Sequence, residues 1–252
     1  MTLHPVLFVG AGPGAPDLLT LKAARALAEA EVILHDRLAS DAILALAGPQ
    51  ARLVDVGKEG FGPSAAQADI NERLVAFAAA GLRVVRLKAG DPTVFGRLDE
   101  ELEAITAAGL GYQIVPGITA ASAAVASLGQ SLTRRGRNAS VRFLTGHDMQ
   151  GFADHDWRAL ARPGEVAAIY MGKRAARFVQ GRLLMFGADP ATPVTAVENA
   201  SRPDQRIVAT SLAALPATLA EAALSGPAVI LFGLAPRAAQ AAVRTLAAEG
   251  AF

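Results

Sequence analysis

The sequence predicts an α/β protein made of two α/β domains, and three observations lead to this class. Short apolar runs alternate with helical segments along most of the 252 residues, an order that is typical of parallel sheets. Several of these runs end in loops rich in glycine and proline, which is where parallel sheets bind their ligands. The chain is 52% hydrophobic, so it can bury a large core in one large domain or in two modest ones.

In the N-terminal half, apolar runs predict strands and the segments between them predict helices. The expected strands are 6–9, 32–35, 52–56, 84–88 and 112–115, and the expected helices are 18–29, 65–80 and 99–108. This α/β unit closes near Pro116. We therefore expect a first domain at 1–117 and a second at 118–252.

The C-terminal half repeats this alternation after a helix of small residues at 120–128. The expected strands are 140–144, 167–171, 194–197, 205–210 and 228–232, and the expected helices are 173–185 and 212–224. The same alternation predicts a parallel sheet in this half as well.

The first glycine loop, from Gly10 to Asp17, indicates a strand that ends at a ligand. Three glycines in five residues allow a bound molecule to approach the backbone closely. Pro13 and Pro16 remove two N–H donors that an anion would use, so a flat, weakly anionic ligand fits better than a phosphate. Similar loops follow at 87–97 and 115–121, so several strand ends are expected to converge on one pocket.

Two alternatives stay open for this first loop. Gly10, Gly12 and Ala15 fit a relaxed dinucleotide fingerprint, and an acidic residue that could take a ribose hydroxyl follows at Asp36. The prolines move the expected helix start to Asp17, which disfavours a dinucleotide. The loop could also be a structural turn.

Composition and charge argue against several function classes. A net charge of +1 argues against nucleic acid as the main partner, because such binding needs an excess of Lys and Arg. No apolar run reaches the length of a membrane span and the N-terminus shows no signal peptide, so a cytoplasmic protein is expected, with no membrane partner. The chain has no cysteine and its four histidines lack the spacing of metal ligands, so no metal is expected.

Basic residues nevertheless gather in two groups that suit a small polyanion. These groups are Arg134, Arg135, Arg137 and Arg142, and Lys173, Arg174, Arg177 and Arg182. A solvated surface is the alternative for either group.

Eight motifs in order along nearly the whole chain resemble those of one family. They are VGAGPGAPDLLTLKAARAL at 9–27, HDRLAS at 35–40, VGKEG at 56–60, RLKAGDPTVFGR at 86–97, VPGITAASA at 115–123, LTRRG at 132–136, TGHD at 145–148 and YMG at 170–172. In these motifs the sequence is similar to the tetrapyrrole methylases. The resemblance implies methyl transfer from S-adenosylmethionine to a porphyrinogen by a homodimer, in a cleft between two α/β domains. It further implies uroporphyrinogen III as the substrate, methylated at C2 and C7.

The resemblance also implies where cofactor and proton-transfer groups lie. The cofactor is expected against small or apolar positions and one carboxylate, namely Pro13, Ala89, Gly90, Asp91, Val94, Thr119, Ala120, Met171, Ala200 and Ala228. Asp36 and Lys58, each just after an apolar strand, match the family's proton-transfer positions. Without the family, Asp36 would more often be a helix cap or an ion-pair partner, and Lys58 a surface residue.

Arg97 and Arg135 fall at family positions suited to hold substrate carboxylates, for which planar bidentate donors are efficient. Glu100 could face a pyrrole N–H as acceptor or base, could orient Arg97, or could form an ordinary helix ion pair with it. We therefore expect catalysis to involve Asp36, Lys58, Arg97, Glu100 and Arg135, without a metal.

The sequence departs from the family pattern at a few positions. Leu98 and Asp99 replace a glycine pair, Ala89 replaces a glycine, and Arg134 replaces a histidine. These changes fall on the substrate side of the expected pocket, so another precorrin C-methyltransferase of the same fold is an alternative. An NAD(P)-dependent oxidoreductase and a non-catalytic nucleotide- or tetrapyrrole-binding protein are the others.

Overall fold

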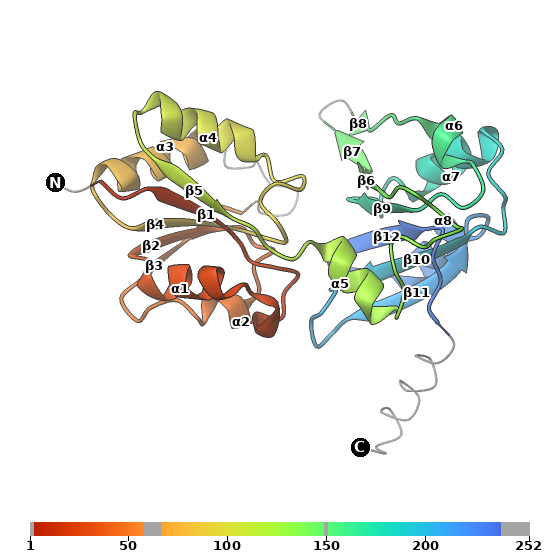
Figure 1. Cartoon of the computed structure of the whole chain (residues 1–252), viewed down its shortest axis with the longest axis horizontal. Helices are drawn as coiled ribbons and strands as arrows, with labels where there is room; N and C mark the ends of the chain where they lie inside the picture. The colour runs from red at the N-terminus through yellow and green to blue at the C-terminus, as the bar shows by residue number, and fades with distance from the viewer. Residues whose placement is uncertain (1–2, 58–66, 149–150, 238–252) are drawn as a thin grey trace, which may run out of the picture. The chain divides into compact units, whose positions relative to one another are not determined.

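The computed structural model describes residues 3–57, 67–148 and 151–237 (Figure 1). The chain forms two compact units, unit 1 at Met1–Thr119 and unit 2 at Ala120–Phe252. Each unit has a sheet and a hydrophobic core of its own, so each is described by itself.

Unit 1 is built on a five-stranded sheet in which every strand pair is parallel. Its strands are β1 (Val6–Gly10), β2 (Val32–His35), β3 (Arg52–Asp55), β4 (Val84–Lys88) and β5 (Tyr112–Val115), in the spatial order β3-β2-β4-β1-β5. The parallel sheet predicted for the N-terminal half is confirmed, and β2, β4 and β5 have the predicted bounds.

Helices cover both faces of this sheet, as Figure 1 shows. On one face lie α1 (Leu21–Glu29) and α2 (Asp41–Leu44), and on the other lie α3 (Gln67–Ala79) and α4 (Leu98–Ala107). Successive residues of β1 point to opposite faces: Phe8 packs on the side of α3 and α4, and Val9 on the side of α1 and α2.

The helix predicted from residue 18 begins later than expected, at Leu21. A short 3-10 turn, η1 (Pro16–Leu18), precedes it, because Pro16 can start a helical turn but cannot donate a backbone hydrogen bond. Thr20 then caps α1, since its Oγ1 accepts a hydrogen bond from the backbone N of Ala23 at 3.1 Å. Helix α2 was not predicted.

Unit 2 holds a second five-stranded sheet in the order β11-β10-β12-β9-β6. Its strands are β6 (Arg142–Thr145), β9 (Ala167–Tyr170), β10 (Pro193–Glu198), β11 (Arg206–Ser211) and β12 (Ala228–Phe232). Only the β6–β9 pair is parallel; the other three pairs are antiparallel. The parallel sheet predicted here was therefore wrong, because residues 199–205 are too few for the crossover that parallel neighbours require.

Helices pack on both faces of this sheet too. On one face lies α5 (Ala120–Ser127), and against the other pack α6 (Trp157–Leu160), α7 (Ala176–Met185) and α8 (Leu215–Ala222). A small hairpin of β7 (His147–Asp148) and β8 (Gly151–Phe152) was not predicted, nor was α6. None of the helices described is long and apolar enough to cross a membrane.

Candidate functional site

The carboxyl ends of β1 and β4 form the topological switch point of unit 1. After β1 the chain passes through α1 on one face to reach β2, and after β4 it passes through α4 on the opposite face to reach β5. The loops that follow these two neighbouring strands therefore leave the sheet in opposite directions. Ligands of open parallel sheets bind at this point, and both loops are glycine loops of the sequence.

Four glycines bring the three loops into contact at this edge. The backbone N of Gly12 donates to the carbonyl O of Gly90 at 3.1 Å, and Gly90 N donates to Gly12 O at 2.8 Å. A Cβ placed on Gly10 would lie 2.6 Å from Cα of Gly117, and one placed on Gly117 would collide with the carbonyl O of Gly90. The loops predicted to converge do meet, and only glycine fits where they touch.

Asp91 fastens the second loop to the third. Its Oδ2 accepts a hydrogen bond from Gly117 N at 2.9 Å, and its Oδ1 accepts from Thr93 N at 2.8 Å and from Thr93 Oγ1 at 2.5 Å. The carboxylate expected to contact the cofactor is thus also the group that holds two loops of this edge in place. Sequence reasoning did not foresee this structural role.

The expected cofactor residues fall into two groups, one in each unit. Pro13, Ala89, Gly90, Asp91, Val94 and Thr119 lie in or next to the three loops at the carboxyl edge of the first sheet. In unit 2, β9 ends just before Met171, and β12 begins at Ala228, which pairs with Glu198 at the end of β10. Met171 is 52% exposed with a positive φ of 55°.

The other two residues of the second group lie at the same edge of the second sheet. Ala200 follows β10 between Asn199 and Ser201, which both have positive φ, and the backbone N of Asn199 donates to the carbonyl O of Pro227 at 2.9 Å. Ala120 starts α5, whose Ala121 N donates to the hydroxyl of Tyr170 at 3.2 Å. The structure thus brings Ala120, Met171, Ala200 and Ala228 to one edge of unit 2.

A buried cluster of charges lies below the carboxyl edge of unit 1. Asp36 Oδ1 accepts from Arg86 Nη2 at 2.7 Å, and Glu101 Oε1 accepts from Arg86 Nε at 3.2 Å and from Lys88 Nζ at 2.9 Å. Arg86, Lys88 and Glu101 are 2%, 4% and 1% exposed, whereas the Asp36 side chain is 30% exposed. Asp36 therefore reaches the surface while the other three are enclosed.

Burial is the main cause that lowers the pKa of the Lys88 ammonium, with the charge of Arg86 acting in the same direction and Glu101 opposing both. Sequence reasoning missed Arg86, Lys88 and Glu101. A signal existed, because two cations inside the apolar run of β4 are unusual for a central strand. Lys58, the other expected proton-transfer residue, lies outside the described residues.

Arg97 and Glu100 form a two-point ion pair. Glu100 Oε1 accepts from Arg97 Nε at 2.8 Å, and Glu100 Oε2 accepts from Arg97 Nη2 at 2.7 Å. Both side chains are about half exposed, at 50% and 49%. The hydrogen bond from Arg97 lowers the pKa of Glu100, and the same bond raises the pKa of Arg97. Of the roles left open for Glu100, orientation of Arg97 and an ordinary helix ion pair both fit this geometry.

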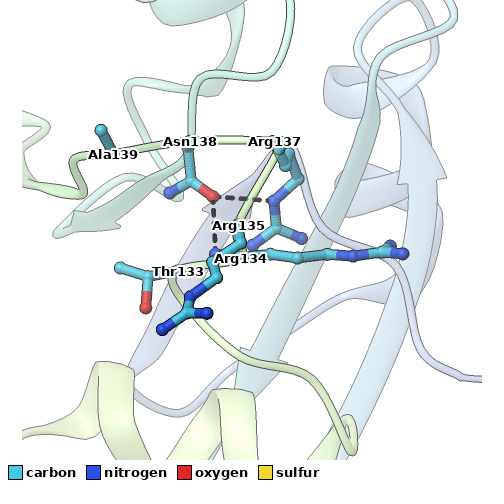
Figure 2. Close-up of a pocket in the computed structure, with 7 residues that line it drawn as sticks. Thr133, Arg134, Arg135, Arg137, Asn138 and Ala139 are labelled. Atoms are coloured by element: carbon cyan, nitrogen blue, oxygen red, sulfur yellow. Dashed lines mark hydrogen bonds between the residues drawn. The ribbon is translucent and has the colours of Figure 1, made fainter.

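In unit 2, an arginine-rich turn at residues 133–139 lines an open pocket of about 640 Å³ (Figure 2). The Asn138 side chain holds this turn together: Oδ1 accepts from Arg134 N at 3.2 Å and from Arg137 Nε at 2.9 Å, and Nδ2 donates to the carbonyls of Leu132 and Ser140. Burial, together with the nearby charge of Arg134, lowers the pKa of Arg137.

The Arg134 and Arg135 side chains extend in different directions from this turn (Figure 2). Neither forms an ion pair with any carboxylate in the described part of the chain. The pocket therefore presents two cations to solvent, which suits an anionic ligand with separated carboxylates.

The chain is similar to known proteins over most of its length. Residues 5–216 match the family of Tetrapyrrole (Corrin/Porphyrin) Methylases. Siroheme synthase of Methylococcus capsulatus is 44% identical over 229 residues, covering 90% of this chain and 48% of that protein. Siroheme synthase of Azotobacter vinelandii is 42% identical over 231 residues, covering 92% and 50%. The chain thus spans about half the length of these curated relatives.

Solved structures agree in fold. A uroporphyrin-III C-methyl transferase from Thermus thermophilus, complexed with S-adenyl homocysteine, superposes with a TM-score of 0.77 at 37% identity, covering 91% of this chain and 92% of that one. A cobalt precorrin-4 methyltransferase superposes with a TM-score of 0.81 at 26% identity, covering 91% and 94%. The α/β fold expected from the resemblance is confirmed.

These similarities also bear on the cofactor. The matched family uses S-adenosylmethionine, so the expected cofactor is confirmed at the level of the family. A dinucleotide-binding loop would begin its helix within the glycine motif, whereas α1 begins at Leu21. The chain belongs to the tetrapyrrole (corrin/porphyrin) methylases.

Proposed function

We propose that the protein transfers methyl groups from S-adenosylmethionine to C2 and C7 of uroporphyrinogen III, giving precorrin-2 by way of precorrin-1. Family membership and a uroporphyrin-III C-methyl transferase among the similar structures support this reaction. The observation that carries the choice of substrate is the turn at 133–139, where Arg134 and Arg135 have no carboxylate partner among the described residues. A porphyrinogen with acetate and propionate arms would supply such partners.

The glycine contacts of unit 1 shape the edge at which we place the methyl donor. Backbone of the neighbouring loops occupies the Cβ positions of Gly10 and Gly117, so these glycines allow the loops to pack together beside the proposed cofactor residues. Bound S-adenosylmethionine supplies a methyl group already activated by its sulfonium. The protein has to align the acceptor carbon with the S–CH3 bond, exclude water and remove a proton. We propose that Pro13, Ala89, Gly90, Asp91, Val94 and Thr119, with Ala120, Met171, Ala200 and Ala228, make these cofactor contacts.

Asp36 is the proposed base. Its carboxylate reaches the surface at the end of β2, and it is ion-paired with Arg86. Removal of the pyrrole N–H proton leaves the N–H electron pair in the ring, which makes the acceptor carbon nucleophilic, and the proton passes to the carboxylate. Lys58 is proposed to steady a substrate carboxylate or to return a proton.

Arg97 and Arg135 are the proposed carboxylate-binding residues. Glu100 accepts from Nε and Nη2 of Arg97, so the guanidinium is held while the donors of Nη1 stay available for substrate. Both carboxylate oxygens of Glu100 already accept from Arg97, which supports an orienting role over proton transfer.

Another precorrin C-methyltransferase is the second candidate. Leu98, which stands where the family has glycine, is buried against the α3–α4 side of the core and begins α4. This change stiffens the start of the helix directly after Arg97, and it would alter which macrocycle fits. A homodimer in the cytoplasm remains a prediction.

The test is an incubation of the protein with S-adenosylmethionine carrying a labelled methyl group and with enzymatically made uroporphyrinogen III, followed by product mass. We expect two methyl additions per macrocycle. Methylation of a precorrin but not of uroporphyrinogen III would favour the second candidate, and no transfer to either would overturn both.

The same assay tests the carboxylate-binding arginines. Arg135→Ala should lower kcat/KM by roughly ten- to hundredfold, because a charge-assisted hydrogen bond contributes about 1.5–3 kcal/mol. Arg135→Lys keeps the charge but loses the planar fork, so its kcat/KM should fall less than that of Arg135→Ala. S-adenosylhomocysteine affinity should not change. Arg158→Ala, an exposed arginine on α6, serves as the matched control and should retain full activity.

A further inference from the structure

The cations of β4 point to the face that α3 and α4 cover. Arg86 and Lys88 are two residues apart, so both side chains lie on the same face as Val84, which packs with the α3–α4 core. Glu101 of α4 meets them there, and Gln67 Nε2 of α3 donates to the same Glu101 Oε1 at 3.3 Å. Four donors and acceptors from three elements thus converge in an apolar layer.

Arg86 has a partner for each of its three nitrogens. Nε donates to Glu101, Nη1 donates to the carbonyl O of Leu87 at 3.0 Å, and Nη2 donates to Asp36 Oδ1. A guanidinium held at three points cannot rotate without breaking a buried hydrogen bond. The position of Asp36 Oδ1 is therefore fixed from below, while Oδ2 has no partner in the described part of the chain.

Charge balance explains why Lys88 and Glu101 are enclosed with Arg86. Two cations, Arg86 and Lys88, face two carboxylates, Asp36 and Glu101, so the cluster is neutral when all four are ionised. Enclosing these charges is costly, as the lowered pKa of Lys88 indicates. Glu101 Oε2 is also buried without a hydrogen-bond partner among the described residues. Apolar side chains at the three enclosed positions 86, 88 and 101 would destabilise the fold less than these charges do. The charges therefore favour a role in positioning Asp36.

We propose that Arg86 is a positioning residue for Asp36: anchored by Glu101 and by the carbonyl of Leu87, it holds one carboxylate oxygen so that the other is free to take the proton from the pyrrole N–H. The inference rests on the proposed function, in which Asp36 is the base. It predicts that Arg86 acts on turnover through Asp36 and not through the fold or through cofactor binding.

The first measurement is Arg86→Lys in the methylation assay. A lysine cannot donate to Asp36 and Glu101 with the fixed fork of arginine. We expect kcat to fall about tenfold, the size of coupling seen between contacting residues, with KM for the porphyrinogen and affinity for S-adenosylhomocysteine nearly unchanged. Arg83→Lys is the matched control, since Arg83 precedes the same strand and pairs with Glu31 at 3.8 Å, away from the carboxyl edge. It should keep the parent kcat.

A double-mutant cycle then separates positioning from a structural effect. Asp36→Asn alone should lower kcat by roughly a hundredfold or more, as expected for loss of a general base. In the Asp36→Asn background, Arg86→Lys should have no further effect on kcat, because the residue it positions is no longer a base. An equal tenfold loss in both backgrounds would overturn the proposal.

Two further outcomes are distinguishable. If Asp36→Asn keeps full activity, the base assignment of the proposed function fails, and the positioning role of Arg86 fails with it. If no variant or parent methylates any porphyrinogen, the proposed function itself fails.

Should Arg86→Lys not fold, Glu101→Gln replaces it in the cycle, because glutamine keeps the shape of the side chain that anchors Arg86 and removes its charge. If Glu101→Gln lowers kcat as much in the Asp36→Asn background as in the parent, the proposal is also overturned.

Discussion

At the scale of single residues, carboxylates near the site are already committed to protein partners. Asp91 joins two loops, Glu100 holds Arg97, and Asp36 pairs with Arg86. Their positions along the chain could be predicted from motifs. Arg97 was foreseen as a partner of Glu100 because the two residues are three apart on a helix. The partners of Asp36 and Asp91 were not, because Arg86 lies on another strand and Gly117 on another loop. Of these three carboxylates, only Asp36 keeps an oxygen without a partner in the described part of the chain.

Lys88 supports a prediction about stability and pH. Burial and the charge of Arg86 lower its pKa below the ordinary 10.5, so between the lowered value and 10.5 the unfolded chain binds more protons at this residue than the folded chain does. The free energy of unfolding therefore gains a contribution that rises with pH in this window, by at most about 1.4 kcal/mol per pH unit. Below the lowered pKa, Lys88 is charged in both states, so the full cost of burying its ammonium reduces the free energy of unfolding.

Lys88→Met removes this titration. We expect the unfolding free energy of the parent minus that of the variant to rise as the pH approaches 10.5, measured by urea unfolding at a series of alkaline pH values. A difference that does not vary with pH would contradict the lowered pKa.

At the scale of elements, the loops and the parallel sheet of unit 1 were predictable, and much of unit 2 was not. Strands β2, β4, β5 and β12 have the bounds that their apolar runs predicted. The second sheet escaped prediction because strand direction is set by the connections. The turn after β10 is short and has positive φ at Asn199 and Ser201, which the sequence pattern alone does not reveal. The elements α2 and α6 and the β7–β8 hairpin are too short for periodicity to detect.

The contact of the three loops can be tested by adding one methyl group. Gly117→Ala would place a Cβ against the carbonyl O of Gly90 and near Gly10, so we expect unit 1 to lose about 1–3 kcal/mol of stability, as overpacking usually costs. Gly181→Ala in α7 is the control, because no atom of the described residues lies within 4 Å of a Cβ placed there and alanine favours helix by about 1 kcal/mol.

Hydrogen exchange of the amides of β1 and β5 provides the measurement. Gly117→Ala should speed their exchange while the amides of β9 and β12 stay unchanged, and Gly181→Ala should not speed either set. Unchanged protection of β1 in Gly117→Ala would mean that the three loops can separate without cost.

At the scale of the whole molecule, the residues that we propose for the cofactor are divided between two units with separate cores. The proposed contacts of unit 1 lie at the carboxyl edge of a parallel sheet, and those of unit 2 lie at one edge of a mixed sheet. If both groups of residues bind the same molecule, its binding must stabilise both units, because ligand bound only to the folded form shifts the unfolding equilibrium of every part that it contacts.

S-adenosylhomocysteine provides this test. At about a hundred times its dissociation constant it should raise the free energy of unfolding by about 2.7 kcal/mol, and NAD or NADP at equal concentration should not. Hydrogen exchange should slow in the loops of Gly10, Gly90 and Gly117 and also around Met171 and Ala228. Protection confined to unit 1 would remove the unit 2 residues from the proposed cofactor site. Stabilisation by a dinucleotide alone would contradict the cofactor assignment itself. The glycine loop at Gly10 would then bind the phosphates of a dinucleotide, although Pro13 and Pro16 lack the N–H donors that phosphates would use.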